Sequence, residues 1–289
     1  MPQPIVIEFL GMMGAGKTTI ARLVIDELQR RGYKCPSTNQ TAEWMIKSGF
    51  NNLPRAIGLL EKLSYYSKFS YLIAALRFPL IAFRSYRYAL SVVPQNRYSW
   101  QSSRTPMNWR GIFKKYIWNS PYDIVVLEEG ALQYNIQIPL FGEQYSSAAQ
   151  RKLISSFMEK ENHLFVCVKI DTETAMERIQ GRAAAAHQEG FSSWQFEDET
   201  EEYQVQKADQ AISLFESTFN HIKALRPDSL IEIDSRTDPK ENEERVIAFI
   251  DKHFPLKEKN AYTNSGLPTP FVRRTTQAQS SLQEKTRGH

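Results

Sequence analysis

The chain has 289 residues, with 36 Lys and Arg against 32 Asp and Glu, which gives a formal net charge of +4. Its composition, 42% hydrophobic and 24% charged, is that of an ordinary globular protein and excludes a collagen, a coiled coil or a wholly disordered chain. The charge is unevenly spread, because residues 55–122 hold eleven basic residues and one acid, Glu61. That segment carries +10, so the rest of the chain carries −6.

The cysteines and the apolar runs bear on the cellular setting. Cys35 and Cys167 are the two cysteines, too few for a disulfide scaffold and not at a zinc spacing, so we expect a reducing, cytoplasmic setting. Cys167 falls inside an apolar run and is predicted to be an inert core thiol.

The most apolar long stretch, residues 71–93, is interrupted by Pro79 and three arginines. A spanning helix needs about 20 mostly apolar residues, so no transmembrane helix is predicted. No signal peptide is expected either, because the first apolar run is short and leads into a glycine-rich turn.

In chain order, short β-rich runs alternate with segments of helical periodicity. Strands are predicted at 5–10, 33–37, 123–128, 163–170 and 230–234. A helix follows the first strand and ends at Gly32, and further helices are predicted at 148–162, 174–187, 201–225 and 239–253. This alternation predicts an α/β fold with a mainly parallel sheet covered by helices on both faces. Residues 1–255 are predicted to form the domain, and the polar residues 256–289 a disordered tail.

Residues 11–18 read G-M-M-G-A-G-K-T and match the phosphate-loop pattern G-x-x-x-x-G-K-[ST] at every position. Glycines let the backbone curl so that its N–H groups point at phosphate oxygens, and the following helix adds its positive end. We expect Lys17 to reach the β- and γ-phosphates and the Thr18 hydroxyl to bind Mg²⁺, with ATP as the nucleotide. The residues predicted to bind the nucleotide are Gly11, Met12, Met13, Gly14, Ala15, Gly16, Lys17, Thr18 and Thr19.

The rest of the sequence narrows the class of phosphate-loop protein. The Asn-Lys-x-Asp motif of GTPases is absent, as is the Leu-Ser-Gly-Gly-Gln signature of transporter ATPases. Over residues 5–254 the sequence resembles the nucleoside and nucleotide kinase group, thymidylate kinases especially. The resemblance lies in four motifs in the expected order, at 5–19, 123–130, 168–182 and 230–236. It implies a three-layer fold with a five-stranded sheet in the order 2-3-1-4-5.

Two adjacent acids end the predicted strand 123–128. A carboxylate at the carboxyl end of a parallel strand can hold a Mg²⁺-bound water or accept a proton from an acceptor hydroxyl. Glu128 aligns with the family acid, whereas Glu129 stands where the family usually has arginine, which leaves the acceptor open. Which acid functions, or whether both only begin a solvated turn, is also open. In many relatives an acid precedes the first glycine, but here that residue is Leu10, so no role is assigned to Glu8.

Arg178 and Arg182 are four residues apart and therefore share one helix face. The resemblance implies that they belong to a lid, about 178–200, where two guanidinium groups would close over the transferring phosphoryl group. The alternative is that they are solvated helix arginines, one of them paired with Asp171 or Glu177.

The basic segment 55–122 holds fifteen aromatic residues and lies where the kinase group binds its acceptor. Aromatic faces can stack on a base and arginines can hold an anion, so we expect a small anionic acceptor. The candidate acceptor contacts are Arg77, Arg84, Arg87 and Arg104. Packing of the rings into a core, and peripheral membrane contact through 71–93, stay open as alternatives. A nucleic-acid partner is not expected, because no reading motif is present.

These observations predict an ATP-dependent kinase of a small acceptor, a nucleotide or nucleoside by resemblance. Lys17, Glu128, Arg178 and Arg182 are the predicted catalytic residues, with Thr18 and Glu128 as the magnesium ligands. An ATP-binding regulatory or membrane-surface protein with slow hydrolysis is the alternative, as is a kinase of a sugar or lipid-linked acceptor. A homodimer is left open.

Overall fold

The structure is a computed structural model. It describes residues 3–37, 117–128, 130, 132, 133, 136, 147–158, 160–188 and 200–254, and for residues 147, 149, 153 and 182–188 it describes the backbone alone. The predictions for residues 55–116, for the lid beyond residue 188 and for the tail 256–289 therefore lie outside the described residues.

The core is a parallel sheet, in which the described strands stand in the order β2-β1-β3-β4. Their bounds are β1 Ile5–Leu10, β2 Ile124–Leu127, β3 His163–Lys169 and β4 Leu230–Asp234. Nearly every residue of β1, β2 and β3 is buried, as expected for parallel strands covered on both faces. The central strand β1 pairs with β2 on one side and β3 on the other, so that Glu8 lies opposite Leu127 and Phe165.

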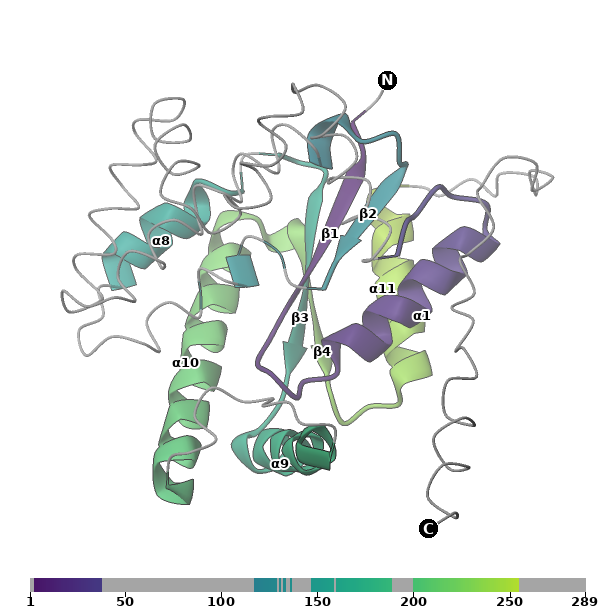
Figure 1. Ribbon diagram of the computed structural model, residues 1–289. Helices are drawn as coiled ribbons and strands as arrows, with labels where there is room; N and C mark the ends of the chain where they lie inside the picture. Colours follow the sequence, from purple (N-terminus) through teal and green to yellow (C-terminus); the bar gives the residue numbers. More distant parts are fainter. Residues whose placement is uncertain are drawn as a thin grey trace, which may run out of the picture.

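Helices cover both faces of the sheet (Figure 1). The described helices are α1 Lys17–Arg30, α8 Ser147–Ser155, α9 Thr172–Gln188, α10 Glu201–Leu225 and α11 Pro239–His253, with short 3-10 turns η1 Ile117–Asn119 and η3 Pro227–Ser229. Helices α1 and α11 pack together on one face, and α10 contacts α8 and α9 on the other. The result is an α/β fold with helices on both faces of a parallel sheet, which confirms the predicted class, whereas the predicted five-stranded order 2-3-1-4-5 is not confirmed.

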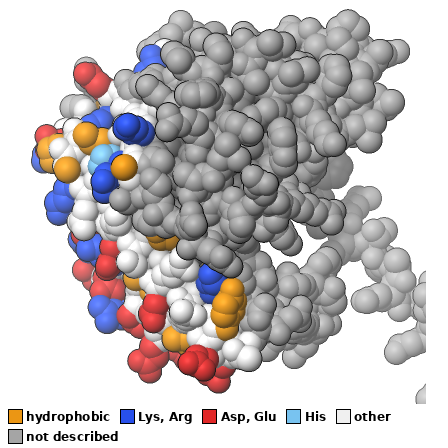
Figure 2. Space-filling model, turned by 90° about the vertical axis from the view of Figure 1, so that its left-hand side faces the viewer, with side chains coloured by type: hydrophobic (Ala, Val, Ile, Leu, Met, Phe, Trp, Pro, Cys, Tyr) orange, Lys and Arg blue, Asp and Glu red, His pale blue; other side chains and the backbone are white. Residues whose placement is uncertain are grey.

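The described part of the side seen in Figure 2 carries charged side chains together with scattered hydrophobic ones. Acidic and basic side chains lie interspersed over this face. Among the described residues, Tyr203 and Leu225 are the large apolar residues with substantial exposure. Within the same residues, none of the helices combines the length and apolar character needed to cross a membrane.

Helix α1 ends as its sequence predicts. Gly32 takes φ 84°, its N–H donates to the Gln29 carbonyl at 2.9 Å, and the Tyr33 N–H donates to the Leu28 carbonyl at 3.1 Å. This pair of bonds is a Schellman motif, which favours glycine because the left-handed conformation is strained for other residues.

The fifth strand, predicted at 33–37, is not confirmed. The structure assigns no strand there, although Lys34 lies against the start of β2, where its carbonyl accepts from the Asp123 N–H at 3.0 Å. The ladder cannot continue normally, because the Lys34 N–H donates to the Asp123 carboxylate, the Cys35 carbonyl accepts from the Gln29 side chain, and Pro36 has no N–H.

The helix predicted at 148–162 is shorter than expected. It ends at Ser155, after which the Phe157 and Met158 amides donate three residues back, to Ile154 and Ser155. Both side chains are buried in the resulting turn, which brings the chain to the start of β3.

Candidate functional site

The loop between β1 and α1 has the backbone geometry that the glycine spacing predicts. Gly14 and Gly16 take φ 85° and 83°, in the left-handed region that only glycine adopts without strain. At Gly11 the constraint is space, because an added Cβ would lie 2.6 Å from the Val168 carbonyl oxygen of β3. The glycines therefore set both the curl of the loop and its close approach to the neighbouring strand.

The loop presents backbone donors at the start of a helix. Helix α1 begins at Lys17, and Gly16 before it supplies no side-chain cap. Within the described part of the chain, the amides of Gly14, Gly16 and Thr18 donate to no backbone or side-chain oxygen. Free N–H groups at the positive end of a 14-residue helix form a ready site for an anion. The loop thus fits a bound phosphate group.

Lys17 is folded onto this loop. Its side chain is buried, and its Nζ donates to the carbonyl oxygens of Gly11 at 2.8 Å and Met12 at 2.9 Å. Thr18 is half-buried in the first turn of α1, and Thr19 beside it is exposed. The ammonium group is thus held at the loop by contacts that it can exchange for phosphate oxygens.

The sheet places the loop at a topological switch point. The chain leaves β1 for α1 on one face of the sheet, and it leaves the adjacent β3 for α9, which packs with the helices of the other face. Ligands of open α/β sheets bind in the crevice that this divergence leaves at the carboxyl ends of the strands. Glu128 follows β2 directly and is half-buried at that same edge. Glu129 lies outside the described residues.

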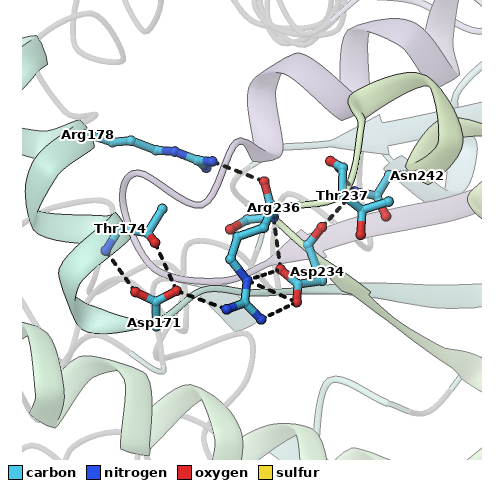
Figure 3. Close-up of polar contacts among 8 residues, drawn as sticks. Asp171, Thr174, Arg178, Asp234, Arg236, Thr237 and Asn242 are labelled. Atoms are coloured by element: carbon cyan, nitrogen blue, oxygen red, sulfur yellow. Dashed lines mark hydrogen bonds and ion pairs between the residues drawn. The ribbon is translucent and has the colours of Figure 1, made fainter.

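Arg178 reaches the phosphate loop from α9 (Figure 3). Its guanidinium donates to the Gly14 carbonyl at 3.2 Å and to the Ser235 carbonyl at 3.1 Å, joining the loop to the residues that follow β4. Asp171, considered above as a partner of such an arginine, instead accepts from the Thr174 N–H and hydroxyl and lies 3.7 Å from Arg236. The Thr174 hydrogen bonds lower the pKa of Asp171. Arg182 lies one turn further along α9, and its side chain is outside the described residues.

The residues after β4 form a tight polar turn beside Arg178 (Figure 3). Asp234 accepts two hydrogen bonds from the Arg236 Nε and a third from Nη2 at 2.7 Å, and these contacts lower the pKa of Asp234 to about 2. Buried Asn242 donates to the carbonyls of Asp234 at 2.8 Å and Thr237 at 3.3 Å. Because both ends of the turn are held, the Ser235 carbonyl is fixed where Arg178 meets it.

A buried network behind the loop was missed from the sequence. Glu8, at the centre of β1, is fully buried, and its Oε1 accepts from the amides of Leu132 at 2.6 Å and Gln133 at 3.2 Å. Its Oε2 lies 3.1 Å from Nε2 of buried His163 on β3. The Gln133 side chain in turn hydrogen-bonds to Gly11. The available signal was a carboxylate inside an apolar strand, which is rare without a buried partner.

The described residues contain no preformed cluster of metal ligands at the loop. No group of three or more His, Cys, Asp or Glu side chains among them could hold a metal. Mg²⁺ usually keeps several waters and binds through one or two protein groups together with substrate phosphates, so the predicted ligands Thr18 and Glu128 do not require such a cluster. The candidate acceptor arginines, Arg77, Arg84, Arg87 and Arg104, lie outside the described residues.

Comparison with known proteins finds similarity to solved structures but to no family model or curated protein. No protein-family model matches the chain, and no curated protein matches it. The structure is similar to that of deoxyadenosine kinase from M. mycoides with bound dATP, with 13% sequence identity and a TM-score of 0.43. The similarity covers 85% of this chain and 99% of that one. The functional argument for this chain depends on its own loop residues.

Proposed function

We propose that this protein is an ATP-dependent kinase that transfers the γ-phosphoryl group to a small acceptor, a nucleotide or nucleoside. The observation that carries the proposal is the phosphate loop itself. It has a complete motif, uncommitted amides at the start of α1 and a buried lysine, and it lies at the switch point of a parallel sheet.

Each site residue has a role consistent with its position. Lys17 would exchange the Gly11 and Met12 carbonyls for the β- and γ-phosphate oxygens of ATP. The Thr18 hydroxyl and Glu128 would hold Mg²⁺, which supplies charge neutralisation on the phosphates when bound. Glu128 would also accept the acceptor's proton.

The arginines of α9 supply the remaining positive charge. Arg178 already lies at the loop, and its Nη1 is 3.9 Å from where a Cβ on Gly16 would stand. A guanidinium there can stabilise the negative charge of the transferring group, and Arg182 on the next turn would join it when the lid closes. Such closure would also exclude water and limit wasteful hydrolysis.

The acceptor class follows from the sequence resemblance and the charge distribution. Thymidylate kinases carry the most similar motif set, and the +10 segment 55–122 would supply arginines and aromatic rings for a phosphorylated base and sugar. An anionic nucleotide is therefore the acceptor that we test first.

The experiment is a titration of Mg-ATP followed by an acceptor screen. Lys17→Ala is expected to weaken Mg-ATP binding at least tenfold, whereas Lys207→Ala, on the outer helix α10, should bind as the wild type does. ADP release by the wild type should rise when a nucleotide or nucleoside acceptor is added. Unchanged affinity in Lys17→Ala would refute the assignment of the loop. Slow ADP release that no acceptor accelerates would instead favour the ATP-binding regulatory protein.

A further inference from the structure

Gln133 contacts both polar groups of one glycine at the start of the phosphate loop. The Gly11 N–H donates to its Oε1 at 3.1 Å, and its Nε2 donates to the Gly11 carbonyl at 2.8 Å. The glutamine side chain is 1% exposed, so water does not compete for these bonds. A side-chain amide thus pairs with the backbone of Gly11 much as a neighbouring strand would.

The backbone of Gln133 is anchored independently of the loop. Its N–H and that of Leu132 donate to Glu8 Oε1, and the second oxygen of Glu8 meets His163 on the next strand. Gly130 approaches the same carboxylate so closely that a Cβ there would lie 2.4 Å from the Glu8 Cδ. The buried network therefore runs from β3 through β1 to the residues after β2, and ends at Gly11.

The hydrogen bond from Gln133 to the Gly11 carbonyl matters when Lys17 leaves that carbonyl. The Gly11 carbonyl accepts from both Lys17 Nζ and Gln133 Nε2, each at 2.8 Å. A lysine that turns to phosphate leaves this buried carbonyl, and an unsatisfied buried acceptor is costly. Because Gln133 stays bonded, the carbonyl keeps a partner and the loop keeps its shape.

We propose that Gln133 is a positioning residue, which fixes the first residue of the phosphate loop and keeps the Gly11 carbonyl hydrogen-bonded while Lys17 is engaged with ATP. The inference rests on the proposed function, since it requires that Lys17 leave the loop for a nucleotide. It assigns Gln133 no contact with the nucleotide itself. Glu8 supports Gln133 indirectly, because it accepts hydrogen bonds from the backbone amides of Leu132 and Gln133.

The test uses the full-length protein with two substitutions at one position and a control. Gln133→Met is similar in size and removes both bonds to Gly11. Gln133→Glu keeps an acceptor for the Gly11 N–H but places a carboxylate beside the Gly11 carbonyl, where it would capture the Lys17 ammonium. Gln150→Met removes a buried amide from α8 on the far side of the sheet. All are compared for Mg-ATP affinity by calorimetry, well below their unfolding temperatures, and for Gly11 amide exchange by NMR without nucleotide.

The proposal predicts a different ranking of the variants for Mg-ATP affinity than for Gly11 amide exchange. Mg-ATP affinity should fall about tenfold in Gln133→Met and further in Gln133→Glu, with Gln150→Met unchanged. Gly11 exchange should speed up in Gln133→Met and stay slow in Gln133→Glu. Affinity that is unchanged in both Gln133 variants, or that falls equally in Gln150→Met, would overturn the inference even if exchange changes. Failure of the wild type to bind Mg-ATP would refute the proposed function instead, and unaltered Gly11 exchange in Gln133→Met would separately refute the contact.

Discussion

Gly130→Ala should destabilise the protein through the buried carboxylate of Glu8. The added methyl group would lie 2.4 Å from Cδ, 2.5 Å from Oε1 and 2.8 Å from Cγ of that side chain. Glu8 cannot retreat, because His163 on β3 and the two amides of Leu132 and Gln133 hold it in a fully buried position. The clash must therefore displace either the carboxylate or the segment that carries Gly130.

The size of the effect follows from these two consequences. Overpacking a close-packed interior costs about 1–3 kcal/mol. Leaving a buried amide of Leu132 or Gln133 without its acceptor costs about 1–3 kcal/mol more. We therefore expect the free energy of unfolding to fall by about 2–6 kcal/mol, measured by urea denaturation with far-ultraviolet circular dichroism.

A second glycine provides a matched control of opposite sign. Gly181 lies exposed within α9, and a Cβ there would meet no atom within 4 Å. Gly181→Ala should stabilise the helix by up to about 1 kcal/mol, since alanine loses less backbone entropy on folding. A shared sign for the two substitutions would contradict the reasoning from space at Gly130.

A double-mutant cycle identifies the clashing partner. Glu8→Ala removes Cγ, Cδ and Oε1, which are the three atoms nearest the new methyl group. In that background the added cost of Gly130→Ala should drop below about 1 kcal/mol, although Glu8→Ala is itself destabilising because it strands the amides and His163. Purely additive costs would show that something other than Glu8 resists the methyl group.

Two further predictions concern other contacts of the described residues. Arg178→Met keeps the aliphatic stem but loses the bonds to the Gly14 and Ser235 carbonyls. It should lower kcat of the proposed transfer at least tenfold with a smaller change in KM for ATP, and an unchanged kcat would refute its role in the transition state. Hydrogen bonds first from Arg30 and then from Arg31 hold the pKa of Glu27 at about 2, against an ordinary 4.5. Because this folded-state pKa is depressed, the stabilisation is complete above pH 4.5 and is lost as the pH falls towards 2. Glu27→Gln should therefore be less stable than the wild type at pH 7, by at most about 1 kcal/mol since Arg30 is exposed, and the two should converge near pH 2 in thermal melts.

Local patterns were sufficient for the elements that the sheet is built from. The strands Ile5–Leu10 and Leu230–Asp234 and the helices Glu201–Leu225 and Pro239–His253 have the predicted bounds, because apolar periodicity and capping residues coincide at their ends. Asp238 illustrates this agreement, since its carboxylate accepts from the first amides of α11. The strand predicted at 33–37 is not formed. The Lys34 N–H donates to the Asp123 carboxylate and not to a backbone carbonyl of the neighbouring strand, and residue propensities do not reveal such a contact.

Candidate site residues could be named from the sequence where they form one contiguous motif, but not where distant residues meet. The phosphate loop is one contiguous motif, so its glycines, Lys17 and Thr18 could be named from eight residues. The contact of Arg178 with Gly14 joins residues 164 positions apart, and that of Gln133 with Gly11 joins residues 122 apart. Such pairs follow from the order of the strands in the sheet, which periodicity alone does not supply.

Glu8 and Glu128 differ in their exposure and in their place relative to the crevice. The residue before the first glycine is Leu10, and it is fully buried in the apolar core. Glu8, two positions earlier on the same strand, is engaged with His163 and two amides and has no exposed surface from which to meet a nucleotide. Strand β1 therefore offers no carboxylate to the crevice. Of the acids discussed here, Glu128 combines partial exposure with a place at the carboxyl end of β2, directly beside the strand that carries the loop. This is the structural reason for proposing Glu128 as the residue that meets magnesium and the acceptor.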